Sequence, residues 1–225
     1  MKISILIPTK NEPLINELIK NVHKALKNYE HEVIVIDKSD KKPKIIDGKL
    51  ILQKSDGLGN GVIEGLRHVT GDIIITMDGD FSHNPEDIPR FIRKIEQSYD
   101  IVIGSRYIDR GLIKNWSTYR KLTSKGANIL ARFLLGVDVS DITSNYRCYK
   151  KNVFNSIGLE KIKATGYAFI QEILYLSKIK GFEIIEIPIT FTDRKYGKSK
   201  LTKKEMYRFL IELLKLKFIR KSYCR

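Results

Sequence analysis

Residues 72–83 of the chain read DIIITMDGDFSH. The run Ile73-Ile74-Ile75 has no polar alternation, which is typical of a strand buried on both faces of a parallel sheet. Asp78 and Asp80 follow this run, and open α/β sheets bind ligands outside the carboxyl ends of their strands. The stretch therefore predicts an α/β fold with a ligand site at one edge of its sheet.

Short Ile/Val-rich runs alternate with helical patterns over the first 105 residues, the order of βαβ units. Strands are predicted at 3–7, 32–37, 50–53, 72–77 and 101–105, and helices at 14–26 and 88–95. Further along, the pattern predicts a basic loop region at 107–119, a helix at 122–135, turns at 136–145, a helix at 169–178 and a strand at 182–191. No linker divides the chain, so we expect one domain over 1–200 and a basic appendage over 201–225.

The composition limits the class of protein. A hydrophobic share of 42% and a charged share of 30% exclude intrinsic disorder and a polytopic membrane protein. No apolar run approaches the roughly 20 residues of a spanning helix, and no signal-peptide pattern precedes the first strand, so we expect a cytoplasmic protein. Cys148 and Cys224 have no spacing that indicates a disulfide framework or a zinc site.

Forty-one Lys and Arg against 26 Asp and Glu give a net charge of +15, which predicts an anionic partner. Residues 194–225 carry +10 of this charge. Apolar residues recur in the same tail at Met206, Phe209, Leu210, Leu213, Leu214 and Leu216. This pattern predicts a helix in an anionic membrane interface, although a helix packed on the domain has the same periodicity. The tail lacks a basic motif with stacking aromatic residues, so nucleic acid is not the expected partner.

Polar residues follow several predicted strands. Asp78 and Asp80 offer two hard oxygen ligands, a pair that suits Mg²⁺ or Mn²⁺ holding a diphosphate; the alternative is a solvated turn before a helix. Gly57 and Gly59 lie where the backbone could approach a ligand closely. Val62 and Thr192 stand where the dinucleotide and Walker A motifs need glycine, which excludes both motifs.

The order and spacing of these motifs resemble the family 2 glycosyltransferases, and within them the polyprenyl-phosphate (dolichyl-phosphate) mannose synthases. The matching segments are 7–12, 35–37, 57–59, 71–72, 77–83, 104–107, 124–128, 141–147, 166–169 and 197–201. The resemblance implies a GT-A (Rossmann-like), mostly parallel sheet sandwiched by helices, with a nucleotide-sugar half at 1–105 and an acceptor half at 106–200. It implies inverting, metal-dependent transfer of a hexose, foremost mannose from GDP-mannose, to a polyprenyl or dolichyl phosphate. UDP-glucose or another UDP-sugar is the alternative donor, and a soluble hydroxyl the alternative acceptor.

The resemblance also implies roles for individual residues. Base and ribose would be held by Pro8, Glu12 and Asp37, and the metal by Asp78, Asp80 and, as in some members, Ser82. Asp80, Arg106 and Arg120 are the expected catalytic residues. The remaining expected substrate-binding residues are Gly57, Gly59, Ser124, Arg147, Arg194 and Lys200.

The chain departs from the family pattern at several positions. Lys38 and the stretch Lys41-Lys42-Pro43-Lys44 replace a second Asp and a D-G-T, which leaves the donor base open. Asn145 replaces a usual glycine. The transmembrane helices of some members have no counterpart, so we expect a peripheral enzyme on the cytoplasmic face of the membrane, with room for a separate membrane-anchor subunit.

The expected chemistry needs no protein nucleophile, because a metal and fixed cations neutralise a leaving diphosphate. A phosphate-monoester acceptor, with a second pKa of about 6, is already largely ionised at neutral pH. A phosphate acceptor therefore predicts direct in-line attack of its oxygen on the anomeric carbon, with inversion and without a base. A hydroxyl acceptor would need a base, for which Asp141 and Glu172 are the candidates.

Overall fold

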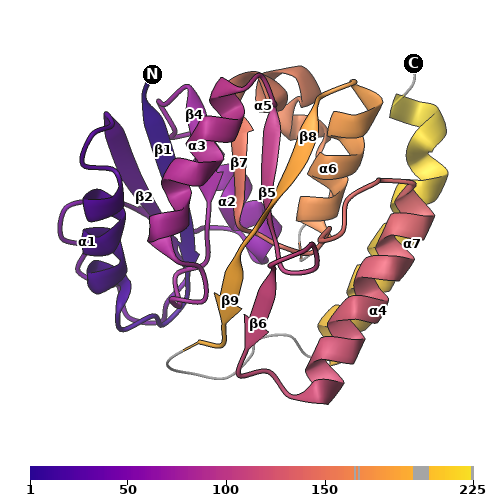
Figure 1. Cartoon of the computed structure of the whole chain (residues 1–225), viewed down its shortest axis with the longest axis horizontal. Coiled ribbons are helices and arrows are strands. Elements are labelled where there is room, and N and C mark those ends of the chain that lie inside the picture. The colour runs from indigo at the N-terminus through magenta and orange to yellow at the C-terminus, as the bar shows by residue number, and fades with distance from the viewer. Residues whose placement is uncertain (165, 167, 195–202, 224–225) are drawn as a thin grey trace.

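The central sheet of the computed structural model has seven strands in the order β3-β2-β1-β4-β7-β5-β8 (Figure 1). Their bounds are β1 (Ile3–Thr9), β2 (His31–Asp37), β3 (Lys49–Leu52), β4 (Ile73–Thr76), β5 (Ile101–Ser105), β7 (Arg147–Lys150) and β8 (Ile184–Pro188). Only β7 runs antiparallel to its neighbours, which confirms the mostly parallel sheet. The structure describes residues 1–164, 166, 168–194 and 203–223.

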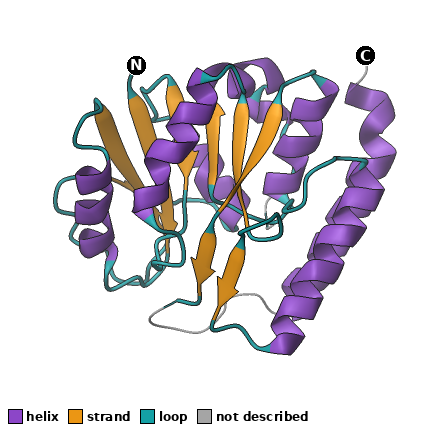
Figure 2. Ribbon diagram, viewed as in Figure 1, coloured by secondary structure: helices purple, strands orange, loops and turns teal. Residues whose placement is uncertain are grey.

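Helices cover both faces of this sheet, as Figure 2 shows. On one face lie α1 (Ile15–Ala25), the short η1 (Pro85–Asp87) and α3 (Ile88–Glu96); on the other lie α2 (Leu58–Leu66), α5 (Lys151–Ile157), the short η2 (Leu159–Lys161) and α6 (Phe169–Ile179). Along β1, Ile5 and Ile7 pack toward α1 and α3, and Leu6 between them packs toward α2. The period-2 geometry of a strand thus supplies two apolar cores from one sequence run.

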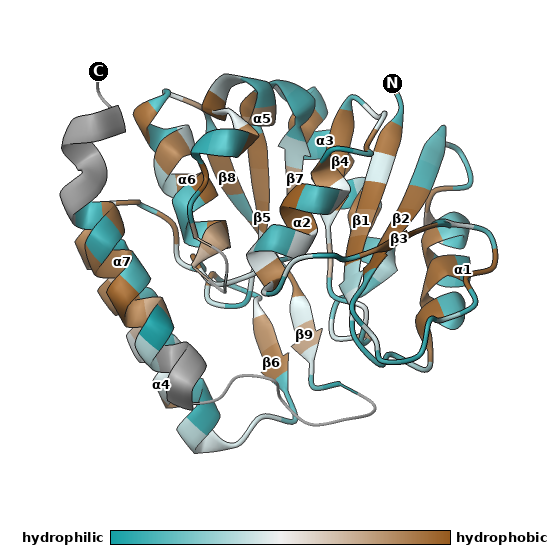
Figure 3. Ribbon diagram, turned by 180° about the vertical axis from the view of Figure 1, so that it is seen from behind, coloured by the Kyte–Doolittle hydropathy of each residue, from teal (hydrophilic) through white to brown (hydrophobic). Residues whose placement is uncertain are grey.

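Two further helices flank α6 on its outer side. They are α4 (Thr118–Leu135) and α7 (Lys203–Tyr223), which lie side by side in both Figure 1 and Figure 3. The single apolar face expected for the C-terminal helix divides in two: Leu213 and Leu216 are buried in the core, whereas Leu210 and Leu214 are exposed. The side chain of Met206 lies outside the described residues.

The ends of α4 follow from local sequence signals. The Ser117 hydroxyl accepts a hydrogen bond from the Arg120 backbone N–H at the N-terminus. Gly136 ends the helix in the left-handed conformation, with φ +62°. The two caps fix where α4 begins and ends, and the Ser117 cap fixes the position of Arg120 in its first turn.

Several elements are absent from the sequence prediction. Residues 107–119, predicted as a loop, contain β6 (Leu112–Lys114), which pairs in parallel with β9 (Thr190–Thr192). The strand predicted at 182–191 is divided into β8 and β9. No element was predicted over 147–157, where β7 and α5 lie. Among the described residues, no helix combines the length and the apolar composition that crossing a membrane requires.

Candidate active site

The strand order reverses between β1 and β4, because the chain winds from β1 through β2 to β3 on one side and places β4 on the other. Open α/β sheets bind ligands at such a point. The loops that follow the two strands touch: a Cβ on Gly79 would lie 2.7 Å from Thr9 Cγ2 and 3.6 Å from Glu12 Cγ. Glycine at position 79 therefore lets Thr9 pack against the turn Asp78-Gly79-Asp80, and Glu12 lies beside the same turn.

Asp37 ends β2 next to this point and is held by three donors. Its Oδ1 accepts hydrogen bonds from the hydroxyls of Thr9 (2.8 Å) and Ser39 (2.7 Å), and its Oδ2 accepts one from the Ser39 backbone N–H (2.9 Å). The carboxylate is almost fully buried. Pro8 lies in β1 opposite Ile36 of β2 and is partly exposed. Asp37 is thus a residue that its place at the end of an apolar strand predicts, whereas Thr9 and Ser39, which fix its orientation, carry no such signal in the sequence.

The turn after β4 holds its two carboxylates in different ways. Asp78 Oδ1 accepts a hydrogen bond from Asn145 Nδ2 at 3.0 Å, and the Asp78 side chain is 34% exposed. Asp80 Oδ1 accepts from both the backbone N–H (3.1 Å) and the hydroxyl (2.6 Å) of Ser82. Ser82 is buried, so the structure places its hydroxyl as a support for Asp80. Asn145, at the position of the departure from the family pattern, contacts the turn directly.

The donor set fits a hard divalent cation that is shared with a ligand. Within the described part of the chain, no group of three or more His, Cys, Asp and Glu side chains is arranged to hold a metal ion. Mg²⁺ typically uses one or two carboxylates together with waters and substrate phosphates. Asp78 and Asp80 supply that number, so the residues fit a metal whose remaining ligands come from a diphosphate and water.

His83, which the sequence does not single out, stabilises the same turn through a backbone hydrogen bond. Its Nδ1 accepts a hydrogen bond from the Asp78 backbone N–H at 3.0 Å. Burial lowers the pKa of His83, and its ring stacks on Tyr146 at a centroid distance of 4.7 Å. A neutral imidazole is needed here, because a protonated Nδ1 could not accept the Asp78 hydrogen bond.

Arg106 follows β5 and forms a buried ion pair with Asp141. The Arg106 backbone N–H and Nε donate to Asp141 Oδ2 at 3.0 and 2.6 Å, and Nη2 donates to Oδ1 at 2.8 Å. Burial alone would raise the pKa of Asp141, but the Arg106 charge and hydrogen bonds lower it below its usual value. Asp141 is thus engaged, and the base expected for a hydroxyl acceptor is not available in this arrangement.

Two other predicted arginines are also paired with carboxylates. Arg120 Nη1 donates to both oxygens of Asp193, at 2.9 and 2.8 Å. Arg194 Nη2 lies 3.6 Å from Asp80 Oδ2, so a cation already faces the metal-type turn. The aromatic ring of Phe191 lies between the turn after β4 and Arg106. Its centroid is 5.4 Å from the centroid of the His83 ring and 5.3 Å from Arg106 Cζ.

Ser124 lies one turn along α4 from Arg120, and its hydroxyl accepts a hydrogen bond from the Tyr107 hydroxyl at 2.8 Å. Lys200 lies outside the described residues. Glu172, the other candidate base, is fully buried and accepts hydrogen bonds from the backbone N–H groups of Lys163 (3.0 Å) and Ala164 (2.7 Å). Both candidate bases are therefore bonded inside the protein.

Comparison with known proteins places this site in a family. The model of glycosyl transferase family 2 matches residues 4–158. The chain belongs to glycosyl transferase family 2. This family 2 domain is 34% identical over 229 residues to a dolichol-phosphate mannosyltransferase of Pyrococcus furiosus, which covers 96% of this chain and 64% of that protein. It is 35% identical over 217 residues to a polyprenol monophosphomannose synthase of Mycolicibacterium smegmatis, which covers 88% of this chain and 80% of that protein. The chain thus spans less than two thirds of the Pyrococcus relative.

A solved structure confirms the GT-A fold. A glucosyl-3-phosphoglycerate synthase from Mycobacterium tuberculosis, crystallised with Mn²⁺, uridine diphosphate and phosphoglyceric acid, superposes with a TM-score of 0.70. The match covers 99% of this chain and 78% of that one at 17% sequence identity. The predicted enzyme class, a family 2 glycosyltransferase, is likewise confirmed by the family match.

In this family 2 glycosyltransferase, Arg147 does not occupy the substrate-facing position expected from the sequence. It is fully buried, and its guanidinium donates to the carbonyls of Ser144 (2.7 Å), Ile170 (2.8 Å) and Ile142 (2.7 Å). A charged side chain in the core needs such partners, and here they tie β7 to α6 and to the preceding loop. We therefore leave Arg147 out of the proposed substrate site.

The glycines before and within α2 serve two different purposes. A Cβ on Gly59 would lie 2.7 Å from Phe169 Cβ and 2.8 Å from the Ala164 carbonyl oxygen, so its lack of a side chain lets α2 approach α6. Gly57 precedes α2 with φ +93°, a conformation that L side chains rarely adopt, and it is exposed. Gly59 is thus a packing glycine, and Gly57 remains a candidate for close approach of a ligand.

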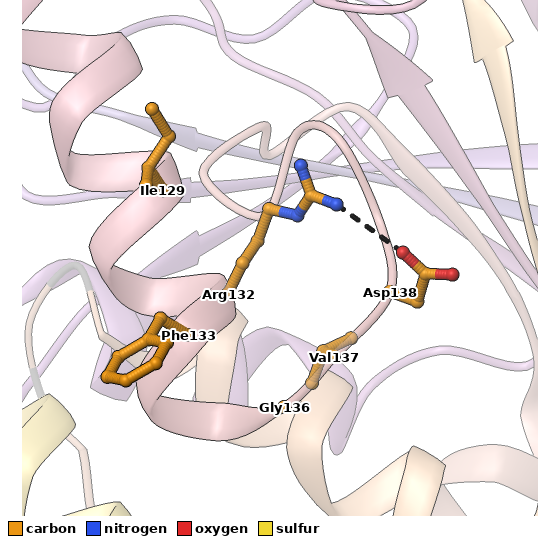
Figure 4. A pocket seen from close by; sticks show the side chains of 6 residues that line it. All are labelled: Ile129, Arg132, Phe133, Gly136, Val137 and Asp138. Atoms are coloured by element: carbon orange, nitrogen blue, oxygen red, sulfur yellow. Dashed lines mark hydrogen bonds and ion pairs between the residues drawn. The ribbon is translucent and has the colours of Figure 1, made fainter.

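A pocket of about 320 Å³ lies at the C-terminal end of α4, away from this site (Figure 4). Its lining residues are Ile129, Arg132, Phe133, Gly136, Val137 and Asp138. Arg132 points across it toward Asp138, with 3.4 Å between Nη2 and Oδ1. Gly136 lies about 24 Å along the helix from Arg120 at the usual rise per residue, so the pocket is not part of the candidate active site.

Proposed function

We propose that this glycosyltransferase moves mannose from GDP-mannose to a polyprenyl phosphate in a metal-dependent, inverting reaction. The observation that carries the proposal is the arrangement at the reversal of strand order: two metal-type carboxylates and Arg194 lie on the donor side, and Arg106 and Arg120 lie across Phe191. The names of the relatives from Pyrococcus furiosus and Mycolicibacterium smegmatis, both mannose-transferring enzymes of prenol phosphates, support the same substrates.

On the donor side, the proposal gives each region a separate task. Asp37, oriented by Thr9 and Ser39, would accept hydrogen bonds from the ribose hydroxyls, with Pro8 and Glu12 beside the nucleoside. Mg²⁺ or Mn²⁺ held by Asp78 and Asp80 would neutralise the diphosphate as it leaves.

On the acceptor side, the proposal needs arginines and no base. A phosphate monoester carries ionised oxygens at neutral pH, so no proton must be removed before attack. One phosphate oxygen forms a bond to the anomeric carbon while the bond from that carbon to the diphosphate oxygen breaks, which inverts the configuration. The buried bonding of Asp141 and Glu172 favours this acceptor over a hydroxyl. A product with retained configuration would contradict the mechanism.

The surface of α4 and α7 supports a membrane location for the acceptor. On α4, four aromatic or aliphatic side chains are strongly exposed: Tyr119 (77%), Leu122 (65%), Ile129 (58%) and Phe133 (78%). Their spacing places them on one stripe of the helix. Lys217 of α7 lies over the Phe133 ring at 5.7 Å, so positive charge borders the stripe. We propose that this stripe and the outward-facing side of α7 lie in an anionic membrane interface. A separate membrane-anchor subunit and a location on the cytoplasmic face stay predictions.

A transfer assay tests the proposed reaction. Radiolabelled GDP-mannose and UDP-glucose are incubated separately with polyprenyl phosphate and Mg²⁺ or Mn²⁺, and label is counted in the organic phase. We expect label from GDP-mannose that requires metal, is lost in Asp80→Ala and is retained in Asp109→Ala, which removes a fully solvated carboxylate. Label from UDP-glucose alone would show a different donor, and no transfer of either sugar would contradict the lipid-phosphate acceptor.

Vesicle sedimentation tests the membrane proposal separately. Phe133→Glu places a charge at the C-terminal end of the exposed stripe, and Ile46→Glu makes the same change at an exposed site in the loop before β3 (61% exposed). Losing the burial of one phenylalanine should weaken binding to anionic vesicles by about 10- to 150-fold. Equal binding by wild type and Phe133→Glu would contradict a membrane contact through α4.

A further inference from the structure

Trp116, the one tryptophan of the chain, lies between β6 and the start of α4. The Arg120 guanidinium lies over its ring, with Cζ 4.0 Å from the ring centroid. The Phe191 ring packs edge-on against the same ring at a centroid distance of 5.3 Å. Arg106 Cζ lies 5.5 Å from the same centroid. One side chain thus contacts both arginines that the proposed function assigns to the acceptor.

The indole N–H of Trp116 is buried and has no hydrogen-bond acceptor among residues 1–164, 166, 168–194 and 203–223. Such a group loses its bonds to water without replacement, and most buried donors in native proteins are paired. An unpaired donor at a candidate active site therefore indicates an acceptor supplied by a ligand. Because two guanidinium groups lie beside the ring, an anionic ligand fits best.

Arg120 is held in one orientation by two contacts, and its side chain is still 31% exposed. Both of its hydrogen bonds to Asp193 come from one nitrogen, Nη1. A guanidinium has five N–H groups in a rigid fork, so this pair uses one corner of it. The Trp116 ring holds the plane of the guanidinium from one face, and Asp193 is itself placed by its backbone N–H, which donates to the Lys114 carbonyl at 3.2 Å.

We propose that the indole N–H of Trp116 donates a hydrogen bond to the phosphate group of the acceptor, next to Arg120. This inference rests on the proposed function in one respect, because it takes the acceptor to be a phosphate monoester. It adds a substrate-binding residue to the site, and it explains why a tryptophan donor is buried without a partner beside two arginines.

Kinetics with a conservative variant test the hydrogen bond. Trp116→Phe removes the N–H and keeps an aromatic ring under Arg120. The matched control is Tyr99→Phe, which removes the hydroxyl of a tyrosine beside Lys94, at the opposite end of β5 from Arg106. With farnesyl phosphate as acceptor, we expect kcat/KM to fall by about 10- to 150-fold in Trp116→Phe, as for the loss of a bond to a charged group. The KM for GDP-mannose and the urea unfolding midpoint should not change, and Tyr99→Phe should resemble wild type. A Trp116→Phe variant with unchanged acceptor kinetics, or with equal losses for donor and acceptor, would overturn the inference.

The fluorescence of the single tryptophan gives a readout that does not depend on turnover. Titrating wild-type protein with farnesyl phosphate should change the emission saturably, and inorganic phosphate should do so at higher concentration. Farnesol, which has the same tail without the phosphate, should leave the emission unchanged. Absence of a response to farnesyl phosphate, or the same response to farnesol, would overturn the inference.

The two experiments separate failure of this inference from failure of the proposed function. If wild type transfers no mannose but its emission responds to farnesyl phosphate and not to farnesol, the phosphate contact stands and the proposed reaction is wrong. If wild type transfers mannose while its emission is unresponsive, the reaction stands and Trp116 has no contact with the phosphate.

Discussion

Replacing Asp141 by asparagine removes the carboxylate that neutralises Arg106 inside the protein. Asp141 accepts three hydrogen bonds from Arg106 and a fourth from the Thr143 hydroxyl at 3.1 Å. Its side chain is fully buried, and that of Arg106 is 7% exposed. Asparagine keeps the shape of the side chain and one acceptor oxygen. The substitution therefore removes only the negative charge and the second acceptor oxygen, which asparagine replaces with an NH₂ donor facing Arg106.

The expected cost follows from the burial of this pair. Removing one partner of a buried ion pair typically costs about 3–5 kcal/mol, because the other charge is left uncompensated. Since asparagine retains one acceptor, we expect the lower end, a decrease of about 3 kcal/mol in the free energy of unfolding. The Arg106→Met/Asp141→Leu double variant should lose less stability than either single variant, because it leaves no buried charge behind.

The pH dependence gives this prediction a sign. Because Arg106 holds the pKa of folded Asp141 below its usual value, the stabilisation is fully present above the unfolded pKa of about 3.9 and is lost as the pH falls through the folded pKa. The difference in the free energy of unfolding between wild type and Asp141→Asn should therefore be constant near neutral pH and become smaller in acid.

Urea unfolding followed by circular dichroism measures both effects. Asp138→Asn, which changes a fully solvated carboxylate three residues away, serves as the matched control and should leave the midpoint unchanged. A cost below about 1 kcal/mol for Asp141→Asn at neutral pH would refute the reasoning, because it would mean that the buried charge of Arg106 does not depend on Asp141.

Three further variants test other parts of the account. Gly59→Ala places a Cβ 2.7 Å from that of Phe169 and should cost about 1–3 kcal/mol in urea unfolding; an unchanged midpoint would contradict the packing role. Ser82→Ala removes a 2.6 Å hydrogen bond to Asp80 and should lower kcat/KM about 10-fold and raise the metal concentration for half-maximal activity, and wild-type metal dependence would argue against this support. His83→Leu deprives the Asp78 N–H of its acceptor and should cost about 1–3 kcal/mol, measured by thermal unfolding, whereas a neutral effect would show that the turn holds without it.

Much of the fold could be predicted because its signals are local. The apolar run Ile73-Ile74-Ile75 and its counterparts in β1 and β2 each predict a strand without reference to the rest of the chain. By contrast, β7 carries the fully buried Arg147, so its sequence does not resemble that of a central strand. The short strands β6 and β9 depend on each other for pairing, and that pairing is a tertiary property.

The candidate site divides in the same way. Asp37 is the last residue of β2, and Asp78 and Asp80 lie in the turn after β4, so their position at one edge could be predicted from strand order alone. The partners that hold them come from distant segments: Thr9 bonds Asp37 across 28 residues, and Asn145 bonds Asp78 across 67. Arg106 matches a phosphate-binding pattern, and its pairing with Asp141 depends on a loop whose path the sequence does not determine.

The claim that the acceptor is ionised before it enters the site is tested most directly by comparing two acceptors. Polyprenyl phosphate and the corresponding polyprenol are presented to the enzyme with radiolabelled GDP-mannose and Mg²⁺, and label in the organic phase is counted for each. The account predicts transfer to polyprenyl phosphate and none to polyprenol, because Asp141 and Glu172 are bonded within the protein and cannot deprotonate a hydroxyl. Comparable transfer to polyprenol would contradict it and would show that the enzyme supplies a base.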